Sequence, residues 1–163
     1  MSDFAFCDGV MKMIDEKFND IDINVRDYDI VLNIKDENDI TVSRQMAKSF
    51  AQKNNFSLAD VTKIATAVSE LARNIYRYAK KGHICIKKKE TGPDKDIIIE
   101  ILAYDRGPGI ENVERAIVRG YTTSERSLGL GLSGIRRLMD SFYINSEVDK
   151  GTVVVVEKRR RGF

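Results

Sequence analysis

The sequence has few of the residues that build metal centres or disulfides, and no apolar run of membrane-spanning length. It contains one histidine, His83, and two cysteines, Cys7 and Cys85, which stand in no metal-like spacing. A histidine-based metal site is therefore not expected, and the thiols are typical of a reduced cytoplasmic protein. The longest apolar stretches, residues 97–104 and 153–156, are far too short for a bilayer. Because the N-terminus also lacks the basic region of a secretory signal, we predict a cytoplasmic protein without a membrane partner.

The chain also lacks a strong net charge. The formal charge is +2 over 163 residues, so nothing in the charge balance requires a nucleic-acid partner. Hydrophobic residues make up 42% and charged residues 32%, which fits one soluble domain with a real core. Basic residues gather at two places, within residues 80–89 and 158–161. They are either solvated strand ends that resist aggregation or a patch for an acidic protein partner.

Residues 28–163 are predicted to form one domain, preceded by an accessory segment at residues 1–27. Apolar residues of the segment recur at the spacing of a short amphipathic helix: Phe6, Val10, Met13, Ile14 and Phe18. In the domain we expect strands at 28–34, 83–89, 96–104, 143–148 and 152–158, and helices at 40–53, 58–79, 111–118 and 131–142. The strand at 96–104 is apolar on both faces and is predicted to be central. This grouping predicts an α+β fold, a two-layer sandwich with helices packed on one face of a mixed β-sheet.

The strongest helical pattern runs from Leu58 to Ala79. Ser57 can cap its start, with Asp60 three residues later in a position like that of a capping box. Gly82 follows the last periodic residue and is predicted to end the helix.

Glu70 and Asn74 lie four residues apart on this helix, so their side chains share one face. They flank the apolar stripe, which places a carboxylate and an amide at the rim of the core. The amide oxygen suits Mg²⁺, and the carboxylate can accept a proton from a hydroxyl or water nucleophile. Taken alone, the pair is also what a solvated helix edge presents.

Asp105 ends the predicted central strand and opens the run Asp-Arg-Gly-Pro-Gly. A carboxylate at a strand end can accept a hydrogen bond from an adenine amino group. Gly107 and Gly109 carry no Cβ, so the backbone can approach a flat base closely there. An ordinary strand-to-helix turn uses the same residue types.

A second glycine cluster, Gly129, Gly131 and Gly134, stands at the start of the last predicted helix. Exposed N–H groups and the helix dipole would hold phosphate oxygens there, although tight packing or a hinge also uses glycine. The cluster is neither a Walker loop nor a dinucleotide fingerprint. Thr152 follows Gly151 in a predicted hairpin turn, and its hydroxyl can face the same nucleotide.

The order of these motifs resembles the GHKL ATP-binding fold, which is shared by gyrase, Hsp90, histidine kinases, MutL and the anti-sigma-factor kinases. The similarity spans about residues 28–158 and rests on four stretches, at residues 69–79, 105–109, 127–134 and 150–152. Within that group, residues 67–84 resemble the RsbT-type switch kinases of the stressosome, which are serine kinases of sigma-factor partner switching.

The resemblance implies ATP and Mg²⁺ as cofactors, with Glu70 as the catalytic base and Asn74 as the Mg²⁺ ligand. The other positions would form the nucleotide site, with Asp105, Gly107 and Gly109 at the adenine, Gly129 and Gly131 at the phosphates, and Thr152 facing the nucleotide. Three residues depart from the family pattern, namely Arg106 inside the aspartate–glycine motif and Glu125 and Arg126 before the second glycine cluster.

The family phosphorylates a serine, sometimes a threonine, on a STAS-domain protein, and its RsbT-type members then activate a downstream phosphatase or another output protein. The first alternative is an anti-sigma factor that switches partners with nucleotide. A detached histidine-kinase catalytic domain is a second, although no phospho-acceptor helix pair precedes the motifs. An inactive ATP-binding relative is a third, against which the presence of Glu70 and Asn74 argues. The sequence leaves the oligomeric state open.

Overall fold

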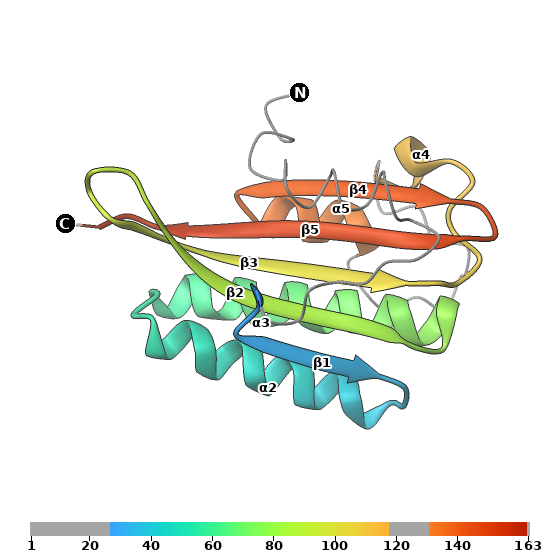
Figure 1. Ribbon diagram of the computed structural model, residues 1–163, viewed down its shortest axis with the longest axis horizontal. Coiled ribbons are helices and arrows are strands. Elements are labelled where there is room, and N and C mark those ends of the chain that lie inside the picture. The colour runs from blue at the N-terminus through green and yellow to red at the C-terminus, as the bar shows by residue number, and fades with distance from the viewer. Residues whose placement is uncertain (1–26, 118–130, 163) are drawn as a thin grey trace.

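The fold consists of a five-stranded sheet with helices on one face (Figure 1). The structure is a computed structural model that describes residues 27–117 and 131–162. The described strands are β1 (Ile30–Ile34), β2 (Gly82–Thr91), β3 (Asp96–Asp105), β4 (Ser141–Glu147) and β5 (Gly151–Arg160). The described helices are α2 (Asn38–Lys53), α3 (Leu58–Asn74), the π-helix η3 (Ile75–Ala79), α4 (Val113–Ile117) and α5 (Gly131–Leu138). The predicted helix within residues 1–27 lies outside the described residues.

The predicted α+β two-layer fold is confirmed, but the sheet is antiparallel rather than mixed. Its strand order is β1-β2-β3-β5-β4, and every described pairing is antiparallel. Strands β3 and β4 run in the same direction, but β5 lies between them, so these two strands do not pair with each other. Strand β3 is central, as its two apolar faces predict.

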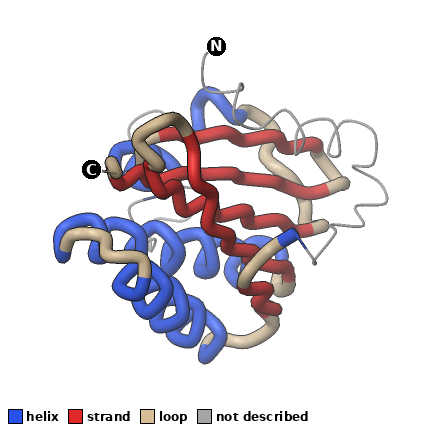
Figure 2. The backbone as a smooth tube through the Cα atoms, turned by 60° about the vertical axis from the view of Figure 1, so that its left-hand side comes forward, coloured by secondary structure: helices blue, strands red, loops and turns tan. Residues whose placement is uncertain are grey.

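Helix α3 forms the middle of the helical layer, where it contacts both α2 and α5. Its apolar residues recur every three or four positions, so they share one face. Val61, Ile64, Val68 and Leu71 are buried against the sheet in the core cluster. The Ser57 side chain accepts a hydrogen bond from the Asp60 backbone N–H at 3.1 Å, which confirms the predicted cap. In Figure 2 the helical layer lies on one side of the sheet.

The C-terminal end of this helix differs from the prediction. The α-helix stops at Asn74, and one π-helical segment, η3, follows it to Ala79. Gly82 does not cap the helix, because it pairs with Asp105 as the first residue of β2. Lys80 takes the positive φ of 71° at the helix end instead. A π-helical turn is frequent at functional sites, and this one borders the cavity described below.

Helix α5 is shorter than the predicted 131–142. It ends at Leu138, whose carbonyl accepts a hydrogen bond from Lys158 Nζ at 2.9 Å. The Asp140 backbone N–H then donates to the Glu157 carbonyl at 2.9 Å and starts the pairing of β4 with β5. Phe142 is buried in the core, as predicted, but from a strand. Among the described helices, none has the length and apolar content needed to span a bilayer.

Candidate functional site

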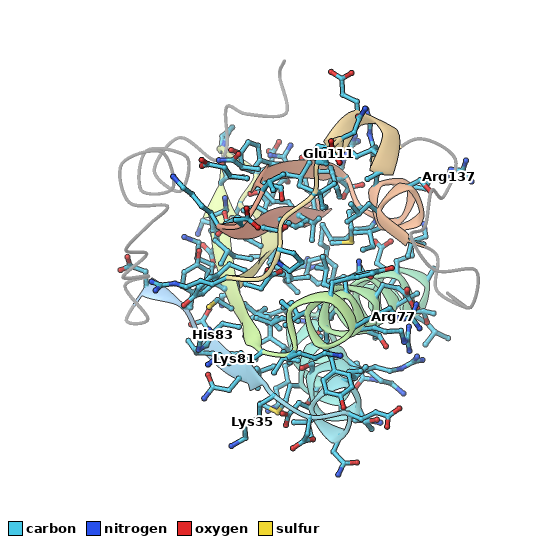
Figure 3. The ribbon with its side chains drawn as sticks, turned by 90° about the vertical axis from the view of Figure 1, so that its right-hand side faces the viewer. Lys35, Arg77, Lys81, His83, Glu111 and Arg137 are labelled. Atoms are coloured by element: carbon cyan, nitrogen blue, oxygen red, sulfur yellow. The ribbon has the colours of Figure 1, made fainter. Side chains whose placement is uncertain are left out.

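A cavity of about 730 Å³ opens at the end of the sheet where β3 ends and β5 begins. The volume lies within the usual range for small-molecule sites. Its floor is apolar, with Leu71 and Ile75 from the helical layer and Ala103 and Val154 from the sheet. Figure 3 faces this end of the molecule, with Glu111 ahead of α4 and Arg77 in η3. Polar side chains, among them Asn74 and Asp105, complete a lining of the mixed kind that small-molecule sites have.

Asp105 supplies a carboxylate at the cavity wall. The Gly107 backbone N–H donates to its Oδ1 at 2.8 Å, and the Thr152 backbone N–H also donates to the carboxylate. Burial raises the pKa of Asp105, and these two hydrogen bonds oppose that rise. The Asp105 carboxylate is half-buried, and the two N–H groups do not use all of its lone pairs. It can therefore accept a further hydrogen bond from a ligand.

The two glycines after Asp105 let the loop pass close to neighbouring segments. At Gly107 this differs from the prediction, in which the missing Cβ made room for a flat base. A Cβ at Gly107 would lie 2.5 Å from the Cβ of Ala79, so this glycine packs against η3 and does not line the cavity. Gly109 does line it, with a φ of 75°, and a Cβ there would lie 2.2 Å from the Glu147 carbonyl oxygen. The pair thus fixes the loop between the helical layer and β4.

Asn74 and Glu70 are separated by the structure. Asn74 is half-buried at the end of α3 and lines the cavity. Glu70 is buried, forms an ion pair with Arg73, and is not among the cavity-lining residues. The predicted rim position is therefore correct for the amide, whereas the carboxylate lies one turn back, held by a neighbouring guanidinium.

The second glycine cluster is described only in part. Gly129 lies outside the described residues, as do Glu125 and Arg126. Gly131 begins α5 with a φ of 66° and lines the cavity. The start of this helix therefore faces the same space as Asp105, which is the arrangement that an anion-binding helix N-terminus requires.

Thr152 lines the cavity beside Asp105, its register partner on β3. Its hydroxyl lies 2.8 Å from the Ser146 hydroxyl. Ser146 also accepts from the Ile110 backbone N–H at 2.8 Å and donates to the Gly151 carbonyl at 3.0 Å. One serine thus connects the loop after Asp105 to the hairpin that carries Thr152.

Sequence reasoning predicted Asn74, Asp105, Gly109, Gly131 and Thr152 at one site, and the structure brings all five to the cavity. It missed Tyr78, which lines the cavity from η3. The repeated spacing of four from Glu70 through Asn74 to Tyr78 was the available signal. Nothing in the sequence marks Ser146, because its contact with the loop at Ile110 spans 36 residues and its contacts with Gly151 and Thr152 depend on the pairing of β4 with β5.

Comparisons with known proteins find related sequences over most of the chain. A family model described as the histidine kinase-like ATPase domain matches residues 34–158. The serine/threonine-protein kinase RsbT of Bacillus subtilis (strain 168) is 42% identical over 123 residues, covering 76% of this chain and 90% of that protein. An anti-sigma F factor of Clostridium acetobutylicum is 33% identical over 130 residues, covering 77% of this chain and 87% of that protein.

Solved structures support the fold. The RsbU and RsbW domains of a Mycobacterium tuberculosis protein superpose with a TM-score of 0.51 at 15% identity, covering 82% of this chain and 34% of that chain. A chain of the SiaB–SiaC complex from Pseudomonas aeruginosa gives a TM-score of 0.50 at 10% identity, covering 93% of this chain and 96% of that chain. At these identities the likeness is one of architecture.

Proposed function

Because the chain belongs to the histidine kinase-like ATPase domain family, we propose that it is an ATP-dependent protein serine/threonine kinase of a bacterial partner-switching pathway. The observation that supports this most strongly is the convergence of Asn74, Asp105 and Thr152 on one cavity. The 42% identity to a serine/threonine-protein kinase over 90% of its length supports the same activity.

Adenine recognition falls to Asp105. Its carboxylate accepts a hydrogen bond from the exocyclic amino group, a contact that a base with a carbonyl at that position cannot make. In this proposal the base would lie against the apolar floor that Leu71, Ala103 and Val154 form. Thr152 adds a hydroxyl beside the carboxylate.

Asn74 is suited to Mg²⁺ because its amide oxygen is a hard ligand at the cavity edge. Among the described residues, no group of three His, Cys, Asp or Glu side chains could hold a metal ion by itself. The ion is therefore expected to arrive with the triphosphate, where it neutralises charge on the phosphate oxygens. Gly131, at the N-terminus of α5, offers backbone N–H groups to the same phosphates, with Gly129 proposed beside it.

Glu70 is proposed as the base. A bond forms between the substrate hydroxyl oxygen and the γ-phosphorus, the bond from that phosphorus to the bridging oxygen breaks, and ADP leaves. The hydroxyl proton passes to the Glu70 carboxylate. Arg73 occupies this carboxylate, so the ion pair has to open when the substrate hydroxyl approaches.

The proposed substrate is a serine or threonine of a STAS-domain protein in the cytoplasm, within a stressosome. After the transfer the kinase is released to activate an output protein, either a phosphatase or another regulator. The test is to incubate the purified chain with [γ-³²P]ATP, Mg²⁺ and the STAS protein encoded beside its gene. Label on a serine or threonine of that protein, absent with Glu70→Gln, is the expected result. A STAS partner that stays unlabelled while bound to the chain with ATP would contradict the kinase proposal.

A second candidate is an anti-sigma factor that uses nucleotide to change partners. The 33% identity to an anti-sigma F factor favours it, since that relative is covered over 87% of its length. Pull-down with the sigma factors of the same genome separates the two. Nucleotide-dependent retention of one sigma factor supports the second candidate, whereas phosphorylation of a STAS protein without such retention supports the first.

A further inference from the structure

The face of the sheet turned away from the helices, here called the outer face, has an apolar row that crosses all five described strands. The row consists of register partners on successive strands: Val31, Cys85, Leu102, Val155 and Tyr143. Val31 at the edge is 39% exposed, whereas the other four are 0–4% exposed. The outer face therefore has an apolar centre as continuous as that of the inner face.

A row of charged side chains runs alongside the apolar row, and these side chains form ion pairs with one another. Lys87 Nζ lies 3.5 Å from a Glu100 carboxylate oxygen, and Lys89 Nζ bonds both Glu100 and Glu157. His83, labelled in Figure 3, lies on the other side of the apolar row, where its ring stacks on Tyr104. These charged and aromatic contacts do not account for the burial of the apolar row between them.

Helices α2, α3 and α5 do not supply that cover. They pack with the inner-face residues, such as Ile99 and Ile101, in one core cluster. The helices lie on one side of the sheet in Figure 2. Leu102 and Cys85 are nevertheless buried at 0% and 1% exposure. Burial also raises the pKa of the Cys85 thiol to about 12. Something other than these helices has to occupy the outer face.

The first residues of the described chain contact this same face of the sheet. The Tyr28 hydroxyl donates to Glu100 at 3.4 Å, and Lys87 Nζ lies 4.9 Å from the centre of the Tyr28 ring. Asp29 then joins the sheet edge through its backbone N–H, which donates to the Ile86 carbonyl at 2.9 Å. Tyr28 and Asp29 therefore lie beside the apolar row, at the point where the accessory segment joins the domain.

Residues 1–26 match this surface in pattern and in length. Their apolar residues recur at helical spacing from Phe6 to Phe18, which as a helix is about 20 Å long. Five strands span roughly 19 Å between the outermost pair. We propose that residues 1–26 dock on the outer face of the same molecule and cover the row from Val31 to Tyr143.

A tethered segment has an advantage over a second copy of the chain. Its effective concentration at the outer face is on the order of millimolar when the tether is short. The cover also lies on the side of the sheet opposite the cavity helices, so it leaves the nucleotide site open. In this proposal the accessory segment covers the apolar row of its own sheet.

The two cysteines make the test direct. Cys7→Ser leaves Cys85 as the single thiol, in the middle of the covered row. In the native full chain, Cys85 should react slowly with a disulfide reagent such as DTNB. Deleting residues 1–26 should raise the rate by at least about tenfold while binding of an ATP analogue is retained. Fast reaction in the full chain, or protection lost on dilution as a dimer dissociates, would overturn the proposal, the latter in favour of a second copy.

A second pair of variants keeps the test decisive if the shortened chain does not fold. In the Cys7→Ser full chain, Val10→Asp places a charge on the apolar stripe, and Lys12→Asp places the same residue off it. Val10→Asp should speed the reaction of Cys85 and Lys12→Asp should not, with circular dichroism unchanged in both. Equal rates for the two variants would refute docking through the stripe, whatever the deletion does.

Discussion

The side-chain oxygens of Ser146 and Thr152 lie 2.8 Å apart, which couples the end of β4 to the wall of the cavity. A serine hydroxyl has one hydrogen, and Ser146 directs it to the Gly151 carbonyl while accepting from the Ile110 N–H. The arrangement that satisfies every group then has Thr152 donating to Ser146. Thr152 is left with lone pairs only toward the cavity, so it is set to accept a hydrogen bond from the ligand or from a bridging water.

Removing the Ser146 hydroxyl should weaken nucleotide binding without unfolding the protein. Ser146→Ala frees both Thr152 and the loop at Ile110, and one hydrogen bond is worth about two- to tenfold in affinity. We expect a rise of that size in the dissociation constant of a non-hydrolysable ATP analogue, measured by calorimetry. Ser141→Ala, at the far end of β4, is the matched control and should bind normally. Equal affinities for the two variants would disprove the orienting role.

Asp105→Asn should abolish most nucleotide binding. An amide can turn a donor toward the adenine amino group, where the carboxylate offers only acceptors. Asp94→Asn, in the exposed turn before β3, is the control for a lost charge. Normal affinity in a folded Asp105→Asn protein would show that the base is recognised elsewhere.

The affinity for nucleotide should fall in mild acid because of the same carboxylate. Burial raises the pKa of Asp105, so it takes up a proton at a higher pH than an exposed aspartate does. The charged form accepts from adenine, and binding is therefore lost as the pH falls through that raised pKa. The same raised pKa makes the charged group a cost to folding above it, so its contribution to stability increases as the pH falls. Titrating the affinity from neutral pH toward about pH 5 checks this, and the pH dependence should be absent in Asp105→Asn.

Glu70→Gln and Asn74→Ala should fail in different ways. Glu70→Gln keeps nucleotide affinity and loses about 10²- to 10⁴-fold in transfer rate, because only the proton acceptor is removed. Asn74→Ala loses the part of the affinity that depends on Mg²⁺. Single-turnover transfer to the STAS protein, with Glu90→Gln on the exposed part of β2 as control, separates them. Normal transfer by Glu70→Gln would exclude it as the base.

Lys158 should matter for stability rather than for binding. Its Nζ, nearly buried, bonds the Leu138 carbonyl and lies 3.3 Å from Asp140, so it closes the end of α5. Lys158→Met leaves the Leu138 carbonyl without its side-chain partner and removes one of the partners of the Asp140 carboxylate, which still accepts from the Arg159 backbone N–H. This loss costs about 1–3 kcal/mol in the free energy of unfolding. Urea denaturation measures it, with the half-exposed Arg159→Met as the comparison. A loss no larger than that of Arg159→Met would contradict the bonding role.

The local patterns were sufficient for most elements and for the polar residues of the site. Asn74, Asp105 and Thr152 stand in short motifs whose chemistry is visible one residue at a time, and the cap at Ser57 is readable from three neighbours. The end of the long helix could not be predicted in this way, because Gly82 pairs with Asp105 in the sheet and does not cap the helix. The sheet direction was also missed, since β5 inserts between β3 and β4 only in three dimensions.

The sequence by itself determined the two-layer α+β fold and the identities of the polar residues that meet at the cavity, because helical and strand periodicity and short motifs are local properties of the chain. Only the tertiary structure decided that Ser146 orients Thr152 and that an apolar row crosses the outer face. The Ser146 contact to Ile110 spans 36 residues, and the row needs the register of five strands. Such relationships depend on which strands pair and in what alignment, and packing of the whole domain sets that alignment.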